Sequence, residues 1–342
     1  MEELVISKQD TNRRLDKFLQ HSLNAAPKNF IYKMLRKKNI LLNGGRASGS
    51  ELLNERDRVT LYLSEETLRR FRRETIPRPC GSLNVLFEDA HILIANKPAG
   101  VLSQPNAGAF GGTGTSGGTG AFGGTGASGG AITDQLLRYL YTKGEYTPSG
   151  STFTPAVCNR LDRNTSGIIL CGKTLHALQA LNAALASRCC HKFYLAVVCG
   201  NLETGGVLKG HLLKDSRANR VEISASASGD SAAEVITEYT PLRVKNGFSL
   251  LRVKLITGKS HQIRAHLQSI GHPIAGDPKY GDLAANRFLA QRYGIKRQML
   301  HAHSVRFAAI GEPLAYLTGR EFFAPQPEEF SRIPFLDLSK FG

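Results

Sequence analysis

The chain has 342 residues, of which 41% are hydrophobic and 21% charged, as is usual for a globular protein. Its net charge of +16 is unusual and favours a polyanionic partner, either nucleic acid or an anionic membrane surface. The apolar runs are too short to span a bilayer, and the N-terminus lacks the pattern of a signal peptide, so we expect no membrane association. The alternative is that the basic charge serves only solubility.

The six cysteines are scattered and show no paired metal-binding spacing. This usage is typical of a reduced, intracellular setting, and we expect a cytoplasmic protein.

Residues 1–64 read as a compact N-terminal domain with two short helices and a small hairpin. The first helix spans RRLDKFLQHSL, and its apolar side chains recur at helical spacing: Leu15, Phe18, Leu19 and Leu23. In the second, IYKMLRKK, the basic side chains share the face opposite the apolar ones: Lys33, Arg36 and Lys37. A basic helical face of this kind suits a phosphate backbone, although a solvated charged face is the alternative.

The charged, proline-ended stretch 65–81 is predicted to be a linker, and residues 82–342 a second domain. Residues 107–130 are about half glycine, so they bury too little apolar surface to offset the entropy of ordering. We expect a disordered insert there. It lacks the GK[ST] ending of a phosphate-binding loop.

The second domain mixes helices with strands joined by turns. Two long strands flank the turn at Asn246 and Gly247, which predicts a hairpin. SHQIRAHLQSI is predicted to be a helix that begins at Ser260 and is closed by Gly271. Because strand-to-strand connections through turns dominate, we expect an α+β fold with a mixed, largely antiparallel sheet.

The first candidate site is CNRLDRNTSGIIL, residues 158–170, in which Asp162 lies between Arg160 and Arg163. Two neighbouring cations favour the ionised carboxylate, as a nucleophile or general base requires. A structural salt bridge in a turn is the alternative reading.

The second candidate site is TGKSHQIRAHLQSIGHPIAGDPKYG, residues 257–281. On its helix Arg264 flanks the apolar stripe, so it needs an anionic partner, and Asp162 is the candidate. His261 and His266 are five residues apart, which is not the spacing of a helical zinc pair. His301 and His303 lack a convincing third ligand, so we expect no metal.

The third candidate site is the strand HKFYLAVV, in which Lys192 and Tyr194 share one face. An aromatic ring beside a cation can stack on a base while the ammonium meets a phosphate. This pattern is weak by itself.

Together these stretches resemble the RluA-type pseudouridine synthase family. The motifs occur in the family's order: VLFEDAHILIANKPAG, NRLDRNTSG, KFYLAVV, TGKSHQIRAHL, GHPIAGDPKYG and LHA at 300–302. The N-terminal domain is similar to the alpha-L RNA-binding module of a ribosomal protein. Asn159 stands where many members have histidine, and the glycine-rich insert is not a family feature.

The resemblance implies a role for each matching residue. Asp162 matches the essential aspartate, Arg264 the arginine that pairs with it, and Tyr194 the tyrosine that stacks on uracil and is proposed to help deprotonate carbon 5. Arg160 matches an arginine that enters the RNA stack. We further expect RNA contacts from Lys192, His261 and Gln262.

The resemblance implies an RNA pseudouridine synthase, an isomerase that needs no cofactor because no atoms enter or leave. The carboxylate attacks the ribose carbon or removes its 2′-hydrogen, and the sequence does not choose between them. We expect a monomer acting on ribosomal RNA of the large subunit, with transfer RNA as the second candidate. A non-catalytic RNA-binding or ribosome-assembly protein, or a metal phosphoesterase, would be the rivals.

Overall fold

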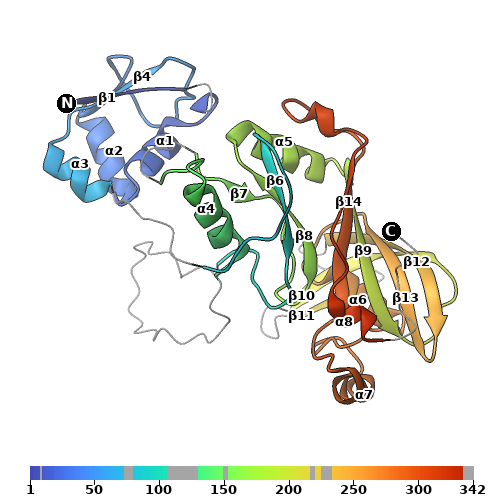
Figure 1. Ribbon diagram of the computed structural model, residues 1–342. Coiled ribbons are helices and arrows are strands. Elements are labelled where there is room, and N and C mark those ends of the chain that lie inside the picture. The colour runs from blue at the N-terminus through green and yellow to red at the C-terminus, as the bar shows by residue number, and fades with distance from the viewer. Residues whose placement is uncertain are drawn as a thin grey trace. The chain divides into compact units, whose positions relative to one another are not determined.

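The computed structural model describes residues 1–7, 10–72, 80–105, 130–148, 153–215, 220–224 and 233–333. The predicted glycine-rich insert, except Gly130, lies outside these residues. The chain divides into two compact units (Figure 1). The first comprises Met1–Ser82, Gln104–Ala156 and Gly172–Gln179, and the second comprises Leu83–Ser103, Val157–Cys171 and Ala180–Gly342. The domain boundaries that we drew from the sequence stay a prediction.

The N-terminal part of the first unit pairs three helices with a small antiparallel sheet in the order β1-β4-β2-β3. Its elements are β1 (Glu2–Val5), α1 (Leu15–Ser22), α2 (Lys28–Arg36), β2 (Ile40–Leu42), β3 (Gly45–Arg46), β4 (Arg58–Leu61) and α3 (Glu65–Phe71). The apolar faces predicted for the two helices are buried in one core. Both helices are therefore confirmed. Helix α4 (Ile132–Thr142) also belongs to this unit.

Helix α3 occupies the beginning of the stretch that we expected to be a linker. The Ser64 hydroxyl accepts the N–H of Thr67, which caps the helix, and two glutamates occupy its first turn. Leu68 and Phe71 then pack against the N-terminal core. A cap and two apolar contacts thus fold residues whose charged composition suggested a linker.

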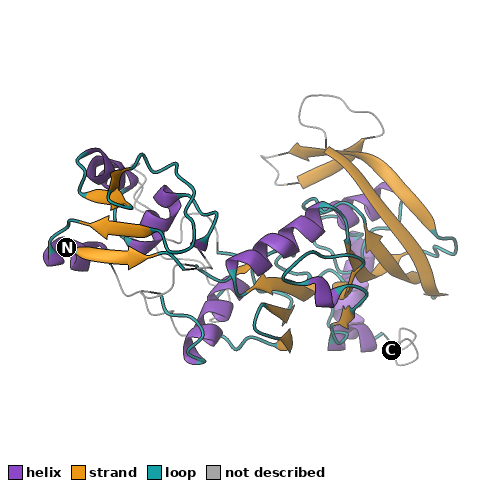
Figure 2. Ribbon diagram, turned by 90° about the horizontal axis from the view of Figure 1, so that it is seen from above, coloured by secondary structure: helices purple, strands orange, loops and turns teal. Residues whose placement is uncertain are grey.

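The second unit is built on a large sheet in the order β11-β10-β12-β13-β9-β14-β8-β6-β5. Figure 2 draws the strands in orange. The β14–β8 pair is parallel, whereas the following pairs are antiparallel: β11–β10, β10–β12, β12–β13, β13–β9, β9–β14, β14–β15 and β6–β5. The α+β fold with a mixed, largely antiparallel sheet is confirmed.

The bounds of these strands are β5 (Val85–Glu88), β6 (Ile92–Lys97), β7 (Ala156–Val157), β8 (Ser166–Gly172), β9 (Cys190–Cys199), β10 (Gly206–Asp215), β11 (Arg220–Ser224), β12 (Ala233–Lys245), β13 (Phe248–Leu255), β14 (Leu300–Phe307) and β15 (Glu321–Phe323). The remaining helices are α5 (Leu175–Ala186), α6 (Gln262–Ser269), α7 (Leu283–Tyr293), η2 (Ala315–Leu317) and α8 (Glu328–Ser331). No helix within the described ranges has the length and apolar character needed to cross a bilayer.

The hairpin predicted at Asn246 and Gly247 joins β12 to β13. Both residues have positive φ, 54° and 76°, as a type I′ turn requires. This hairpin, which lies beside β9 in the sheet, is confirmed.

Helix α6 begins later than predicted. Its N-cap is His261, which has left-handed backbone angles, and not Ser260. The reason is that the Gln262 side-chain oxygen accepts the N–H of Lys259 and the Thr257 hydroxyl, which closes a turn ahead of the helix. Gly271, with φ 78°, follows the helix as expected.

Gly167 lies where β8 passes β14. Its φ is +111°, and a Cβ atom added there would lie 2.2 Å from the backbone oxygen of Ala302. Only glycine fits this close parallel approach.

We predict that Gly167→Ala lowers the free energy of unfolding by about 2–5 kcal/mol, because an unfavourable φ and a backbone clash act together. The matched control is Gly319→Ala, whose φ is +82° but whose added Cβ would meet nothing within 4 Å. It should cost only about 1–2 kcal/mol. Urea unfolding followed by circular dichroism compares the two, and equal losses would contradict the clash.

Candidate active site

The predicted ion pair between Asp162 and Arg264 is present. Nη1 of Arg264, on α6, lies 2.7 Å from Oδ2 of Asp162, in the turn before β8. The turn is closed by the Thr165 N–H, which donates to the Asp162 carbonyl. The Asp162 side chain is 24% exposed and that of Arg264 only 6%. The carboxylate can therefore meet a ligand while its arginine partner stays covered.

Arg264 is also held from behind by a second carboxylate, that of Asp277. Its Nε donates to Oδ2 of Asp277 at 2.7 Å and its Nη2 donates to Oδ1 at 2.9 Å. Burial would raise the pKa of Asp277, but Arg264 and the N–H groups of Lys279 and Tyr280 lower it below the usual range. Since a two-point pair fixes the plane of a guanidinium, Asp277 aims the third nitrogen at Asp162.

The two oxygens of Asp162 differ. Oδ2 accepts from Arg264, whereas no residue in the described part of the chain donates a hydrogen bond to Oδ1. One oxygen is thus anchored and the other is open to a nucleotide.

Arg160 and Arg163 do not contact the carboxylate of Asp162, although their positions in the sequence suggested that they would. The Nε of Arg163 donates to the carbonyl of Gly100 at 3.0 Å, and Arg160 is exposed. Among the described residues, Arg264 is the ion-pair partner of Asp162, and Nε2 of His261 lies 3.9 Å from its Oδ2.

Lys97, which sequence reasoning missed, fixes the loop that carries Asp162. It ends β6 with its side chain fully buried, and its ammonium donates to the carbonyls of Pro98, Val101 and Arg163 at 3.1, 2.7 and 3.0 Å. Burial lowers the pKa of Lys97, and the charge of Asp162 opposes this effect. The available signal was a lysine at the end of an apolar strand, directly before Pro-Ala-Gly.

Tyr194 and Lys192 project from the same face of β9. Burial first, and then the charge of Asp162, raise the pKa of the Tyr194 phenol. Tyr194 therefore stays protonated, and its neighbours make it a weaker candidate base than a free tyrosine. Burial lowers the pKa of Lys192. Its ammonium lies close to Gly258, because a Cβ atom added at this glycine would be 3.2 Å from Nζ of Lys192.

His261 lies at the site, whereas Gln262 is committed to the protein. Nε2 of His261 is 3.9 Å from Oδ2 of Asp162. Gln262 is buried, and its amide donates to the Ile236 carbonyl and the Thr237 hydroxyl. The amide of Gln262 therefore stabilises the start of α6, and the RNA contact that we expected of this residue stays a prediction.

The C-terminal histidines form structural hydrogen bonds. Nδ1 of buried His301 bonds the Ser166 hydroxyl at 2.9 Å, which links β14 to β8 beside the Asp162 turn. Burial lowers the pKa of His301 to about 4, so its imidazole is neutral. His303 bonds the Ala324 carbonyl.

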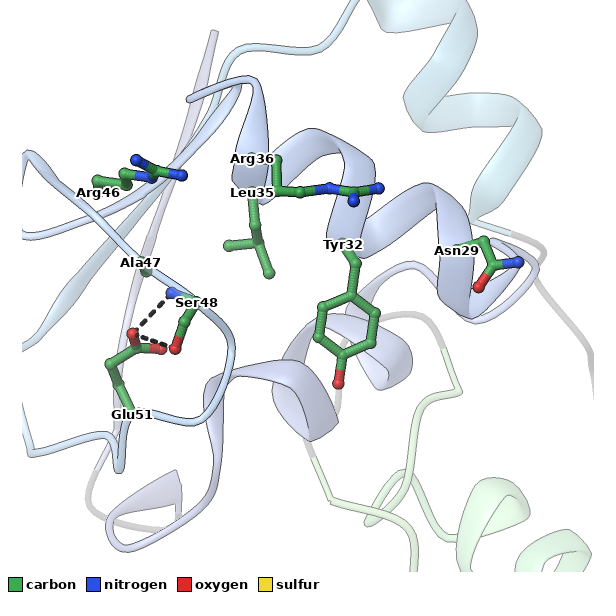
Figure 3. A pocket seen from close by; sticks show the side chains of 8 residues that line it. All are labelled: Asn29, Tyr32, Leu35, Arg36, Arg46, Ala47, Ser48 and Glu51. Atoms are coloured by element: carbon green, nitrogen blue, oxygen red, sulfur yellow. Dashed lines mark hydrogen bonds between the residues drawn. The ribbon is translucent and has the colours of Figure 1, made fainter.

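Lys33, Arg36 and Lys37 are exposed at the end of α2 in the first unit. A cavity of about 640 Å³ lies beside this helix. Figure 3 shows side chains that line it, among them Arg36, Arg46 and Tyr32. Glu51 on the opposite side accepts hydrogen bonds from Ser48. The cavity combines cations with an aromatic ring.

Residues 91–269 match the family model described as RNA pseudouridylate synthase. Ribosomal large subunit pseudouridine synthase C of Haemophilus ducreyi is 34% identical over 88% of this chain and 86% of its own length. Ribosomal large subunit pseudouridine synthase D of Xanthomonas campestris is 29% identical over 97% of this chain and 91% of its own. The solved human RNA Pseudouridylate Synthase Domain Containing 4 shares the fold, with a TM-score of 0.53 at 19% identity over 73% of this chain and 90% of its own.

The chain therefore belongs to the RNA pseudouridylate synthase family. It is an isomerase that converts uridine in RNA to pseudouridine, and the family, fold and enzyme class predicted from the sequence are confirmed. The matched region begins at residue 91, so the N-terminal RNA-binding module stays a prediction.

We predict that Asp277→Asn lowers the rate of pseudouridine formation at least about tenfold, because an amide cannot hold both Nε and Nη2 of Arg264 as acceptors. Stability should also fall by roughly 3 kcal/mol, since a buried charge loses its partner. Single-turnover rates and urea unfolding measure the two effects.

The matched control is Asp282→Asn, which replaces an aspartate whose carboxylate only caps α7 by accepting the Ala285 N–H. It should keep the wild-type rate. Wild-type activity in Asp277→Asn would contradict the aiming role.

Proposed function

We propose that this pseudouridine synthase modifies large-subunit ribosomal RNA in the cytoplasm, as a monomer, with Asp162 as its acting carboxylate. The two relatives, pseudouridine synthases C and D, are named for the large ribosomal subunit, which supports this substrate. One chain supplies Asp162, Arg264 and Asp277, which supports a monomer. The observation that carries the proposal is the partly exposed carboxylate of Asp162, with one oxygen bonded by Arg264 and the other open.

The reaction conserves every atom of the nucleotide. The bond from ribose C1′ to N1 breaks, the uracil turns, a bond from C1′ to C5 forms, and C5 loses a proton while N1 gains one. Oδ1 of Asp162 either bonds to C1′ or removes the 2′-hydrogen to give a glycal. In both paths Arg264 keeps Oδ2 in place and stabilises the carboxylate between steps.

Tyr194 lies near the carboxylate, and we assign it to stacking against the uracil. Its phenol is buried and its pKa is raised, so it holds the base as an aromatic surface and a hydrogen-bond donor. Removal of the C5 proton by Tyr194 would require a nearby group to take the phenol proton first.

The RNA is bound, in this proposal, by cations of both units. Arg160 and Lys192 contact the target region together with His261, while Lys33, Arg36 and Lys37 contact the phosphate backbone through the predicted N-terminal module. These contacts offset the cost of taking the uridine out of its stack, which is a few kcal/mol.

We predict that wild-type protein releases tritium from large-subunit ribosomal RNA labelled at C5 of uridine, taken from cells that lack the gene. Asp162→Asn should release tritium at least about a thousandfold more slowly, because the amide can neither attack carbon nor take a proton. Labelled transfer RNA from the same cells is the comparison substrate, and Asp282→Asn is the matched variant.

Equal release by wild type and Asp162→Asn would remove Asp162 from the mechanism. Release from transfer RNA alone would replace the ribosomal substrate by the second candidate.

We predict that replacing Lys33, Arg36 and Lys37 together by glutamine weakens RNA binding and flattens its salt dependence. Each lost phosphate contact should reduce the slope of log affinity against log salt by roughly 0.7–0.9. The matched control removes the same charge in the second unit, at the exposed Lys209, Lys245 and Arg292. Equal slopes for the two triple variants, measured over a series of potassium chloride concentrations, would exclude the role of α2.

A further inference from the structure

The backbone of His261, whose side chain lies beside Asp162, has an unusual conformation. Its φ is 56° and its ψ is 11°, in the left-handed region that non-glycine residues seldom adopt. Such a strained conformation persists only where the surroundings fix it. It places Nε2 of the imidazole 3.9 Å from Oδ2 of Asp162.

Tyr280 sets the orientation of this imidazole. Its hydroxyl lies 3.0 Å from Nδ1 of His261, and the Val221 N–H donates to the same hydroxyl at 2.9 Å. The Tyr280 ring is almost fully buried and stacks under the guanidinium of Arg264 at 4.8 Å. One rigid tyrosine therefore contacts both side chains that face Asp162.

The proton of the neutral imidazole belongs on Nε2. A phenol donates readily to an imidazole nitrogen, which suits Nδ1 as the acceptor, and the negative charge of Asp162 favours a proton on the nitrogen that faces it. Burial lowers the pKa of His261, against the charge of Asp162, so the ring is neutral near pH 7.

This Nε2–H has no acceptor within hydrogen-bond distance in the described part of the chain. The distance to Asp162 is too long for a hydrogen bond, and the His261 side chain is 17% exposed. A free donor thus lies beside the carboxylate, at the place where a substrate sugar must be.

We propose that Nε2–H of His261 donates a hydrogen bond to the 2′-oxygen of the target ribose, which makes His261 the residue that selects ribonucleotides. The inference rests on the proposed role of Asp162. Whether Asp162 attacks C1′ or removes the 2′-hydrogen, the 2′-oxygen is one or two bonds from the reacting atom. Because the 2′-hydroxyl is what separates RNA from DNA, a donor at this point reads it directly.

The experiment combines a substitution at His261 with a change at the 2′ position of the substrate. The substrate is a synthetic stem-loop of large-subunit ribosomal RNA that contains the modified uridine, with either a hydroxyl or a hydrogen at the 2′ position of that nucleotide. The single-turnover rate constants divided by the dissociation constants are compared for wild type, His261→Phe and His261→Gln. His176→Phe, at a partly exposed position on α5, is the matched control.

The intrinsic effect of the 2′-hydroxyl on the chemistry is the same in every variant and cancels from the comparison. We expect His261→Phe to lose about tenfold on the ribose substrate, and the ratio between ribose and deoxyribose substrates to shrink by about the same factor. His261→Gln, whose amide nitrogen can reach the position of Nε2, should retain most of the ratio, and His176→Phe all of it.

An unchanged ratio in His261→Phe would overturn the inference while leaving the proposed function intact. The absence of tritium release by wild type from any large-subunit RNA would instead overturn the proposed substrate. If His261→Phe does not fold, Tyr280→Phe repeats the comparison, because it releases the imidazole from its fixed orientation and should lower the ratio. An unchanged ratio in Tyr280→Phe would equally overturn the inference.

Discussion

The site depends on one guanidinium that is shared between two carboxylates. Nε and Nη2 of Arg264 donate to Asp277 and Nη1 donates to Asp162, and the three donor–acceptor distances are 2.7–2.9 Å. Because Asp277 is completely buried and Asp162 is not, the arginine is fixed on the inner side and can act on the outer side. A lone arginine with a flexible side chain would follow the movements of the carboxylate and would not define its position.

The loop that carries Asp162 is fixed separately. Lys97 bonds three carbonyls, one of them that of Arg163, and the Ser103 hydroxyl donates to the carbonyl of Leu161. On the far side of Asp162, the close approach at Gly167 and the bond from Ser166 to His301 attach β8 to β14. Two different strands thus hold the two ends of a short turn, and this limits where its carboxylate can go.

The sequence predicted the parts of this site that repeat a local pattern. Apolar periodicity located α1 and α2, turn chemistry located the hairpin at Asn246 and Gly247, and the charge of a helical arginine required an acid such as Asp162. It did not reveal the partners of Asp277 and Lys97. Those contacts join atoms 13 and 66 residues apart, and no spacing rule connects a buried lysine to carbonyl groups.

Side chains act as local partners of the backbone at two places where the sequence pattern suggested something else. Gln262 closes the turn before α6, so the helix begins after Ser260. Ser64 caps α3, so charged residues that suggested a linker form a helix. In both cases side-chain hydrogen bonds help to set the local structure, and composition does not show them.

The sharing of Arg264 also answers an electrostatic difficulty. The acting group must be an anion, yet its substrate is a polyanion, and the protein as a whole carries a charge of +16. An arginine paired with Asp162 alone would neutralise it and weaken it as a nucleophile or base. Because Arg264 also pairs with Asp277, the group of two carboxylates and one guanidinium keeps one net negative charge, and Asp162 is its more exposed carboxylate. The cations that attract the phosphates can then lie elsewhere on the protein, where they do not quench the carboxylate.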